Sequence, residues 1–136
     1  MKNTLNYFIV ILISASVITS CNSRSYDKAE NAQDAGREFI RASLDGDYKK
    51  AKFYLLKDTT NLLLLIRQQR DYEQLNDEQK KLHRESSIRP ISIIPTNDSI
   101  TIYKYFNTYN PKDTTSIRVV RANGDWLVDL KSILKL

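Results

Sequence analysis

The apolar side chains change their spacing at Ser86-Ser87, and this change constrains the fold more than any other feature of the sequence. Before this point, apolar residues recur every three or four positions, which is typical of amphipathic helices. After it, residues 88–130 are rich in isoleucine, valine, threonine and tyrosine, which favour strands. Helices followed by a separate set of strands predict an α+β fold with the helices packed on one face of an antiparallel sheet.

Three or four helices are predicted, at about residues 27–44, 48–56, from 61 onward and 80–85. Gly46 is suited to the left-handed conformation that ends the first helix, and Asp47 is suited to cap the second. We expect Thr59 or Thr60 to cap the third helix. Asn76–Gln79 has the spacing of a capping box and predicts the start of the fourth.

Four strands are predicted, at about residues 88–94, 100–109, 115–122 and 125–130. Pro90 and Pro95 cannot donate a backbone hydrogen bond, so the first strand is expected at a sheet edge or with an irregular pairing. A turn is expected at Asn110–Asp113. Asn123-Gly124 is the strongest hairpin signal in the chain and predicts a tight turn between the last two strands.

The alternation along residues 100–109 divides their side chains between two faces of the sheet. We expect Ile100, Ile102 and Phe106 to face the helices. The opposite face would then carry a stripe of Tyr103, Tyr105 and Tyr109. Because tyrosine is enriched at interfaces, this stripe is a candidate surface for a protein partner or a homodimer through the sheet. The alternative is a half-exposed sheet face with cross-strand aromatic pairs.

The first 20 residues have the layout of a secretory signal peptide. Lys2 supplies a positive charge, and Leu5–Ile13 is an apolar stretch too short to span a bilayer as a permanent helix. Ile18-Thr19-Ser20-Cys21 resembles the bacterial lipobox. That resemblance implies cleavage before Cys21, a diacylglycerol on its sulfur and acylation of its amino group. The alternative is an ordinary signal followed by an incidental cysteine.

These features predict three parts of the chain: a lipoprotein signal peptide at 1–20, a lipidated tether at 21–26, and a single domain at 27–136. The expected location is a membrane of the bacterial cell envelope, reached through the lipid anchor. The outer membrane is the expected membrane, and the sequence does not indicate which of its leaflets holds the anchor. Several acyl chains would hold the protein there without a transmembrane helix.

Two segments carry a resemblance to a known class of protein. They are FIRASLDGDYKKAKFYLL at 39–56 and NGDWLVDL at 123–130. Together they resemble small bacterial lipoproteins of unknown function with a nuclear-transport-factor-2-like, or cystatin-like, domain, over about residues 27–130. The resemblance implies helices packed on the concave face of a curved four-stranded sheet, forming a cone. That superfamily includes enzymes, ligand carriers and association modules, so the fold alone does not choose an activity.

Within such a cone, Lys104 and Arg121 are candidate ligand-binding residues. Lys104 lies between Ile102 and Phe106 on the expected inner face, and Arg121 ends the next strand. Two cations at the mouth of the cone would suit an anionic ligand. The alternatives are a bulge that turns Lys104 outward, or a buried stem whose ammonium group reaches water.

The composition argues against several kinds of chemistry. One histidine, one cysteine and three glycines exclude a multi-histidine metal site, a cysteine-based zinc site and a glycine-rich phosphate loop. No catalytic set can be assembled around His83 or the aspartates of the strands. No cofactor, metal or nucleic-acid partner is expected, since the net charge of +5 is scattered. We therefore expect a non-enzymatic module that binds a ligand or a protein; the alternative is an enzyme or small-molecule carrier that uses the interior cavity.

Overall fold

The computed structural model describes residues 25–133, which form four helices followed by a four-stranded antiparallel sheet. The helices are α1 (Ala32–Asp45), α2 (Tyr48–Phe53), α3 (Thr59–Glu73) and α4 (Asp77–Glu85). The strands are β1 (Ile88–Asn97), β2 (Ile100–Asn107), β3 (Asn110–Ala122) and β4 (Asp125–Asp129), followed by a 3₁₀ helix, η1 (Leu130–Ile133). This order confirms the predicted α+β fold. Within residues 25–133, no helix is long and apolar enough to cross a bilayer.

The helix boundaries follow from side-chain capping. Gly46 has a φ of 75° and ends α1 by donating its N–H to the carbonyls of Ala42 and Ser43, as predicted. The Asp47 side chain accepts from the backbone of Lys50 and begins α2. The capping box at the start of α4 is also confirmed. The predicted cap of α3 was wrong.

The residue that caps α3 is Asp58, whose carboxylate accepts the backbone N–H of Asn61 at 2.9 Å. The two threonines that follow lie inside the first turn of the helix. An aspartate and a threonine are both common N-cap residues, and the sequence alone placed the start of the helix one to two residues too late. The correction matters because Asp58 also takes part in a buried polar cluster described below.

The strands pair in the order β1-β2-β3-β4, so β1 lies at one edge, as its prolines predicted. Its register shifts between Pro90 and Ser92 and again between Pro95 and Asn97. Asn123 and Gly124 have φ values of 52° and 84°, and they form the predicted hairpin turn. The turn expected at Asn110–Asp113 was misplaced. The chain turns at residues 108–109, and β3 already begins at Asn110.

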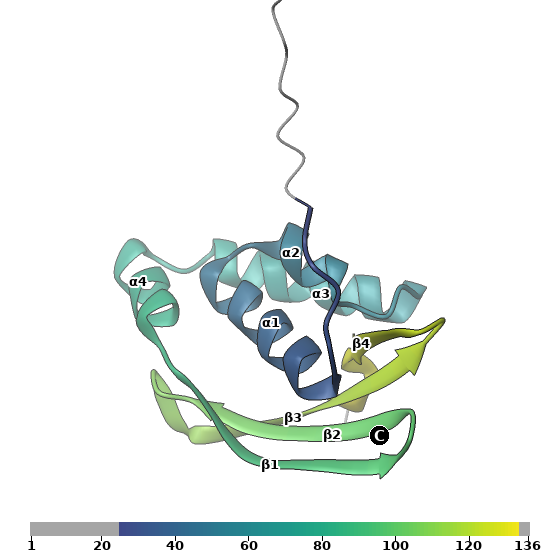
Figure 1. Ribbon diagram of the computed structural model, residues 1–136. Helices are drawn as coiled ribbons and strands as arrows, with labels where there is room; N and C mark the ends of the chain where they lie inside the picture. The colour runs from purple at the N-terminus through teal and green to yellow at the C-terminus, as the bar shows by residue number, and fades with distance from the viewer. Residues whose placement is uncertain (1–24, 134–136) are drawn as a thin grey trace, which may run out of the picture.

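The sheet is curved, and α1 lies in its hollow, where it contacts all four strands (Figure 1). The other helices lie around α1 on the same side, and no described helix covers the convex side. The core fills the space between α1 and the concave face. Its fully buried members include Ala35, Ile40, Leu55, Tyr103, Ile117, Val119, Val128 and Leu130.

The two faces of β2 were assigned the wrong way round. Thr101, Tyr103 and Tyr105 point to the concave face and are buried, whereas Ile102 is only half-buried on the convex face. The register explains the result, because Tyr103 pairs with Ile117, which is buried against the helices. Gly36 makes room for the ring, since a Cβ atom there would lie 3.0 Å from Cδ2 of Tyr103.

The outer edge of β4 is occupied by the segment that follows α2. Leu56 donates its N–H to the carbonyl of Val128 at 2.9 Å, and Val128 donates to the carbonyl of Tyr54 at 2.7 Å. Leu55 forms a parallel bridge with Val128. This short backbone pairing holds the segment between α2 and α3 against the sheet edge.

Candidate functional site

A cavity of about 340 Å³ opens between the helices and the concave face of the sheet. α1 contributes Phe39, Ile40 and Ser43, and the sheet contributes Tyr105, Asn107 and Thr115. α2, α3, α4, η1 and the turn after β2 supply the remaining wall, part of which is aromatic. A concave, mostly apolar space with a few polar groups is the usual form of a small-molecule site, and the volume lies at the lower end of the usual range. It is therefore the candidate functional site of this protein.

One wall of the cavity is a continuous series of aromatic rings. The centroids of Tyr48 and Tyr72 lie 6.0 Å apart, and those of Tyr72 and His83 lie 5.9 Å apart, both in edge-to-face geometry. His83 stacks on Tyr109 with centroids 4.1 Å apart and an angle of 23° between the planes. These four side chains come from α2, α3, α4 and the turn after β2. They give the cavity a stiff aromatic surface.

The position of His83 is fixed from two sides. Arg41 of α1 donates to the carbonyls of Ser86, His83 and Arg84 at 2.7, 3.3 and 3.1 Å, and so caps the C-terminus of α4. The Ser86 hydroxyl accepts the N–H of Tyr109 at 3.2 Å. The same serine therefore links the end of α4 to the turn that carries Tyr109. These bonds hold the imidazole and the phenol ring in their stacked arrangement.

The cavity walls are mostly uncharged at neutral pH, and the carboxylate among the lining residues is Asp71, whose side chain is exposed. Burial raises the pKa of the Tyr48, Tyr105 and Tyr109 hydroxyls above the ordinary value. Burial lowers the pKa of His83, which favours the neutral imidazole. The Tyr48 hydroxyl donates to the carbonyl of Gln68 at 3.1 Å, so it is already engaged. These features suit an uncharged ligand better than an anion.

One polar atom in the cavity has no partner. Oδ1 of Asn107 is buried and makes no hydrogen bond with any described residue. A buried polar atom left without a partner costs free energy, and native proteins contain few of them. Asn107 lines the cavity, and a ligand with a hydrogen-bond donor would satisfy this oxygen once the amide group turns toward it. The amide is thus the most informative polar group of the site.

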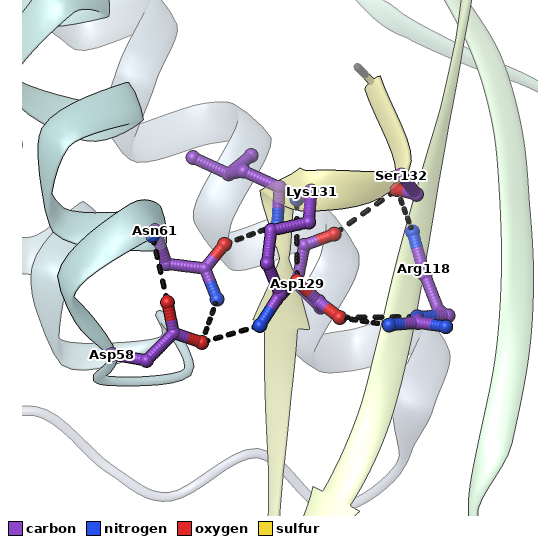
Figure 2. Close-up of polar contacts among 7 residues, drawn as sticks. Asp58, Asn61, Arg118, Asp129, Lys131 and Ser132 are labelled. Atoms are coloured by element: carbon purple, nitrogen blue, oxygen red, sulfur yellow. Dashed lines mark hydrogen bonds and ion pairs between the residues drawn. The ribbon is translucent and has the colours of Figure 1, made fainter. Parts of the chain in front are cut away.

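A second group of polar side chains lies where α3, β3 and η1 meet (Figure 2). We call it the polar cluster; it consists of Asp58, Asn61, Arg118, Asp129, Lys131 and Ser132. Asn61 is fully buried, donates to Asp58 at 2.9 Å and accepts the N–H of Leu130 at 2.8 Å. Lys131 pairs with Asp58 at 2.5 Å.

Asp129 is the buried anion of the polar cluster. It forms an ion pair with Arg118 and accepts the N–H of Lys131 at 3.2 Å. Burial alone would raise its pKa, but the hydrogen bonds from Arg118 and Lys131 outweigh this and lower it. The side-chain hydrogen bond from Lys131 likewise lowers the pKa of Asp58. Because the buried donors and acceptors of this cluster pair with one another, it stabilises the fold and offers no open binding position.

The structure separates the two cations expected to bind an anion. Lys104 pairs with Ser116 across the convex face and is exposed, so its predicted inward position was wrong. Arg121 pairs with Trp126, on the same face as Val119, and its guanidinium lies 5.8 Å from the indole ring. The two side chains lie on opposite faces of the sheet, because alternation within a strand reverses the side at each residue. They form no joint site.

The tyrosine stripe is also divided. Tyr103 and Tyr105 are buried at 1% and 9% exposure, so the prediction that they form an accessible partner surface was wrong. Tyr109 remains 43% exposed and lines the cavity instead. The predicted lipidation site Cys21 lies outside the described residues, and its role stays a prediction.

Sequence reasoning missed the residues that make the cavity. His83 was set aside because no catalytic set could be assembled around it, and Tyr48, Tyr72 and Asn107 received no functional role. Their only local signal is composition, since His83 and Tyr72 lie on otherwise polar stretches of helix. Their convergence depends on how four separate elements pack, which no spacing within one element can encode.

Comparisons with known proteins give no assignment for this site. No family model matches the chain, and neither the curated proteins nor the solved structures contain a match. Among residues 25–133, no group of three histidine, cysteine or carboxylate side chains is placed to hold a metal ion.

Proposed function

We propose that this protein is a lipid-anchored protein of the bacterial cell envelope that binds a small uncharged aromatic ligand without transforming it. The observation that carries the ligand part is the aromatic cavity with the unpaired Oδ1 of Asn107. Aromatic walls favour a flat apolar ligand, and the amide oxygen favours one with a hydroxyl or amino group. The anchoring part rests on the lipobox-like sequence before Cys21.

The polar groups of the cavity support binding more than catalysis. The Ser43 hydroxyl donates to the carbonyl of Phe39 at 3.0 Å, and the Tyr48 hydroxyl donates to Gln68. Neither hydroxyl is paired with a base. His83 stacks face to face on Tyr109, so a face of the imidazole is used for packing. An α+β architecture with helices in the hollow of a curved sheet also supports membership in the nuclear-transport-factor-2-like class.

A fragment-binding experiment tests the ligand proposal. Phenol and toluene are titrated separately against the protein, and binding is followed by NMR. We expect phenol to bind more tightly, because its hydroxyl can donate to Asn107 and toluene has no donor. Ser43→Trp fills the cavity and should abolish binding; Ser116→Trp, on the exposed convex side, is the matched control. Phenol binding that survives in Ser43→Trp would place the ligand elsewhere.

The anchoring proposal is tested in cells. Mass spectrometry of protein taken from membranes should find acyl groups on Cys21 and a chain that begins there. Cys21→Ala should abolish both the modification and the membrane association. An intact unmodified N-terminus on the wild-type protein would contradict the proposal.

A protein partner is a second candidate function, and exposed apolar residues on the convex face, instead of the tyrosines, support it. Ile94 pairs with Ile102 on that face and is 57% exposed. An apolar side chain of this exposure on the edge strand β1 favours a covered face. If this face forms a homodimer, analytical ultracentrifugation will show a dimer that Ile94→Asp converts to monomer. A wild-type chain that stays monomeric at high concentration would remove the homodimer.

A further inference from the structure

Four lysines surround the point where the described chain begins. Lys28, Lys49, Lys52 and Lys57 line one shallow depression together with Ser25, Tyr26 and Phe53. We call this surface the lysine groove. It contains no acidic side chain. Figure 1 shows the N-terminal segment passing beside α2, which carries two of these lysines.

Most of this positive charge is not neutralised by the protein itself. Lys28 pairs with Asp125 at 2.9 Å. Lys49, Lys52 and Lys57 are exposed and form no ion pair with any residue in 25–133. Lys50, also on α2, points elsewhere and pairs with Glu38 at 2.6 Å.

The nearby acidic side chains line an adjoining depression, which shares Ser25, Tyr26 and Lys28 with the lysine groove. Asp27, Glu30, Asp34 and Glu38 line it together with Lys50. Asp34 is paired with Arg37, and Glu38 with Lys50. The N-terminal segment therefore borders a basic depression and an acidic one. An anionic surface would meet the first and be repelled by the second, which limits the orientations of the domain.

The lysine groove also carries an amphipathic aromatic pair. The ring centroids of Tyr26 and Phe53 lie 5.5 Å apart in a tilted arrangement. Aromatic rings beside lysines are the usual composition of surfaces that sit at the headgroup level of a bilayer. Their placement next to the start of the described chain is the second observation that points to a membrane.

The proposed lipid on Cys21 would hold this groove close to a bilayer. Cys21 precedes Ser25 by four residues, and consecutive Cα atoms lie about 3.8 Å apart, so the two can be separated by at most about 15 Å. The field of an anionic membrane decays over about 8 Å at physiological salt. A tether of this length keeps the lysines within reach of that field.

We propose that the lysine groove docks the domain onto the anionic lipid headgroups of the membrane that holds its anchor. This inference rests on the proposed lipidation of Cys21. Docking restricts the domain to orientations in which the lysine groove faces the bilayer and the adjoining acidic depression lies beside the contact. Each lysine near an anionic surface raises the docked population about five-fold, because the free-energy gain is about 1 kcal/mol per charge.

Amine labelling of the lipidated full chain tests this proposal. The protein is reconstituted into vesicles of phosphatidylcholine alone or of phosphatidylcholine mixed with phosphatidylglycerol. An amine-reactive ester then labels exposed lysines, and mass spectrometry reports each site. We expect labelling of Lys49, Lys52 and Lys57 to fall about five-fold on the anionic vesicles. Lys104, on the convex face, is the internal control and should not change.

Two further conditions identify the cause of any protection. In about 1 M salt the Debye length falls to about 3 Å, and the protection should disappear. Lys49→Gln combined with Lys52→Gln should restore the labelling of Lys57. The matched control, Lys81→Gln with Lys112→Gln, removes the same charge outside the groove and should leave Lys57 protected.

The outcomes separate this proposal from the one it rests on. Protein that floats with both kinds of vesicle, with equal labelling on each, would overturn the docking and leave the anchor intact. Protein with an unmodified Cys21 that does not float would overturn both. Protection on phosphatidylcholine after addition of inorganic phosphate would assign the lysines to a soluble anion and overturn docking to lipid.

Discussion

Asn61 and Asn107 lie in two regions where helices meet the sheet, and their side-chain amides differ in hydrogen bonding. The Asn61 amide is buried in the polar cluster and bonded at both its nitrogen and its oxygen. The Asn107 oxygen is buried in the cavity and bonded to nothing among the described residues. A network whose donors and acceptors are all paired stabilises the fold. An unpaired acceptor beside a cavity costs free energy, and a bound ligand that donates to it would remove that cost.

The largest effect is expected from Asn61→Ala. The substitution leaves the buried N–H of Leu130 without an acceptor and removes the hydrogen bond to Asp58. We expect the free energy of unfolding to fall by about 3 kcal/mol. Urea denaturation measures it, with Asn110→Ala, exposed at the start of β3, as the control. A loss below about 1 kcal/mol would mean that the polar cluster does not support the fold as the contrast requires.

Gly46→Ala tests how the cavity wall is built. Gly46 has a φ of 75°, and a Cβ atom there would lie 2.5 Å from Cε1 of Tyr72. Backbone strain and this clash together should cost about 2 kcal/mol of unfolding free energy. In a Tyr72→Leu background only the backbone part, about 1 kcal/mol, should remain. Equal losses in the two backgrounds, measured by denaturation, would show that the ring does not rest on Gly46.

Acid should weaken the polar cluster, and protonation of His83, whose pKa burial lowers, should add a loss of stability on the cavity side that begins nearer neutral pH. The pKa values of Asp58 and Asp129 are lowered, so the stability they contribute is complete above the unfolded value of about 3.9. It is lost as the pH falls through the folded values, because the unfolded chain then binds more protons. Urea midpoints should therefore fall as the pH is lowered below about 5. Asp58→Asn should flatten this dependence, and an unchanged pH profile in that variant would contradict it.

The smallest effect on stability is expected from Asn107→Ala. No hydrogen bond within the described residues is lost, so the free energy of unfolding should change by less than about 0.5 kcal/mol. Phenol binding should weaken in the same variant, since its hydroxyl loses an acceptor. A large loss of stability would show that Asn107 belongs with Asn61 and that the comparison fails.

The fold was predictable because most of its signals are local. Helical spacing, the left-handed Gly46, the Asn76 capping box and the Asn123-Gly124 turn are each written in a few neighbouring residues. The burial of β2 was not predictable in this way. Alternation defines two faces of a strand, and only the pairing of Tyr103 with Ile117 and the space above Gly36 decide which face lies inward.

The candidate site was less predictable than the fold. Tyr48, Tyr72, His83 and Tyr109 lie on four elements and meet only after α4 is fixed by Arg41. The convergence of rings from distant parts of the chain is a property of packing. The prediction that Lys104 and Arg121 form a joint site was wrong for the same reason. Which residues lie next to each cation depends on the strand register and on the face of the sheet to which its side chain points.

The treatment of the two sheet edges has a consequence for how the molecules behave when crowded. Strand β4 is already paired along its rim with Tyr54–Leu56, and β1 carries prolines at two places where its register slips. A strand from another copy could not pair with the edge of β4, which is already hydrogen-bonded, and could pair only irregularly with β1. Growth of ribbons or fibres by strand addition therefore has no starting point here, so high local density need not end in aggregation.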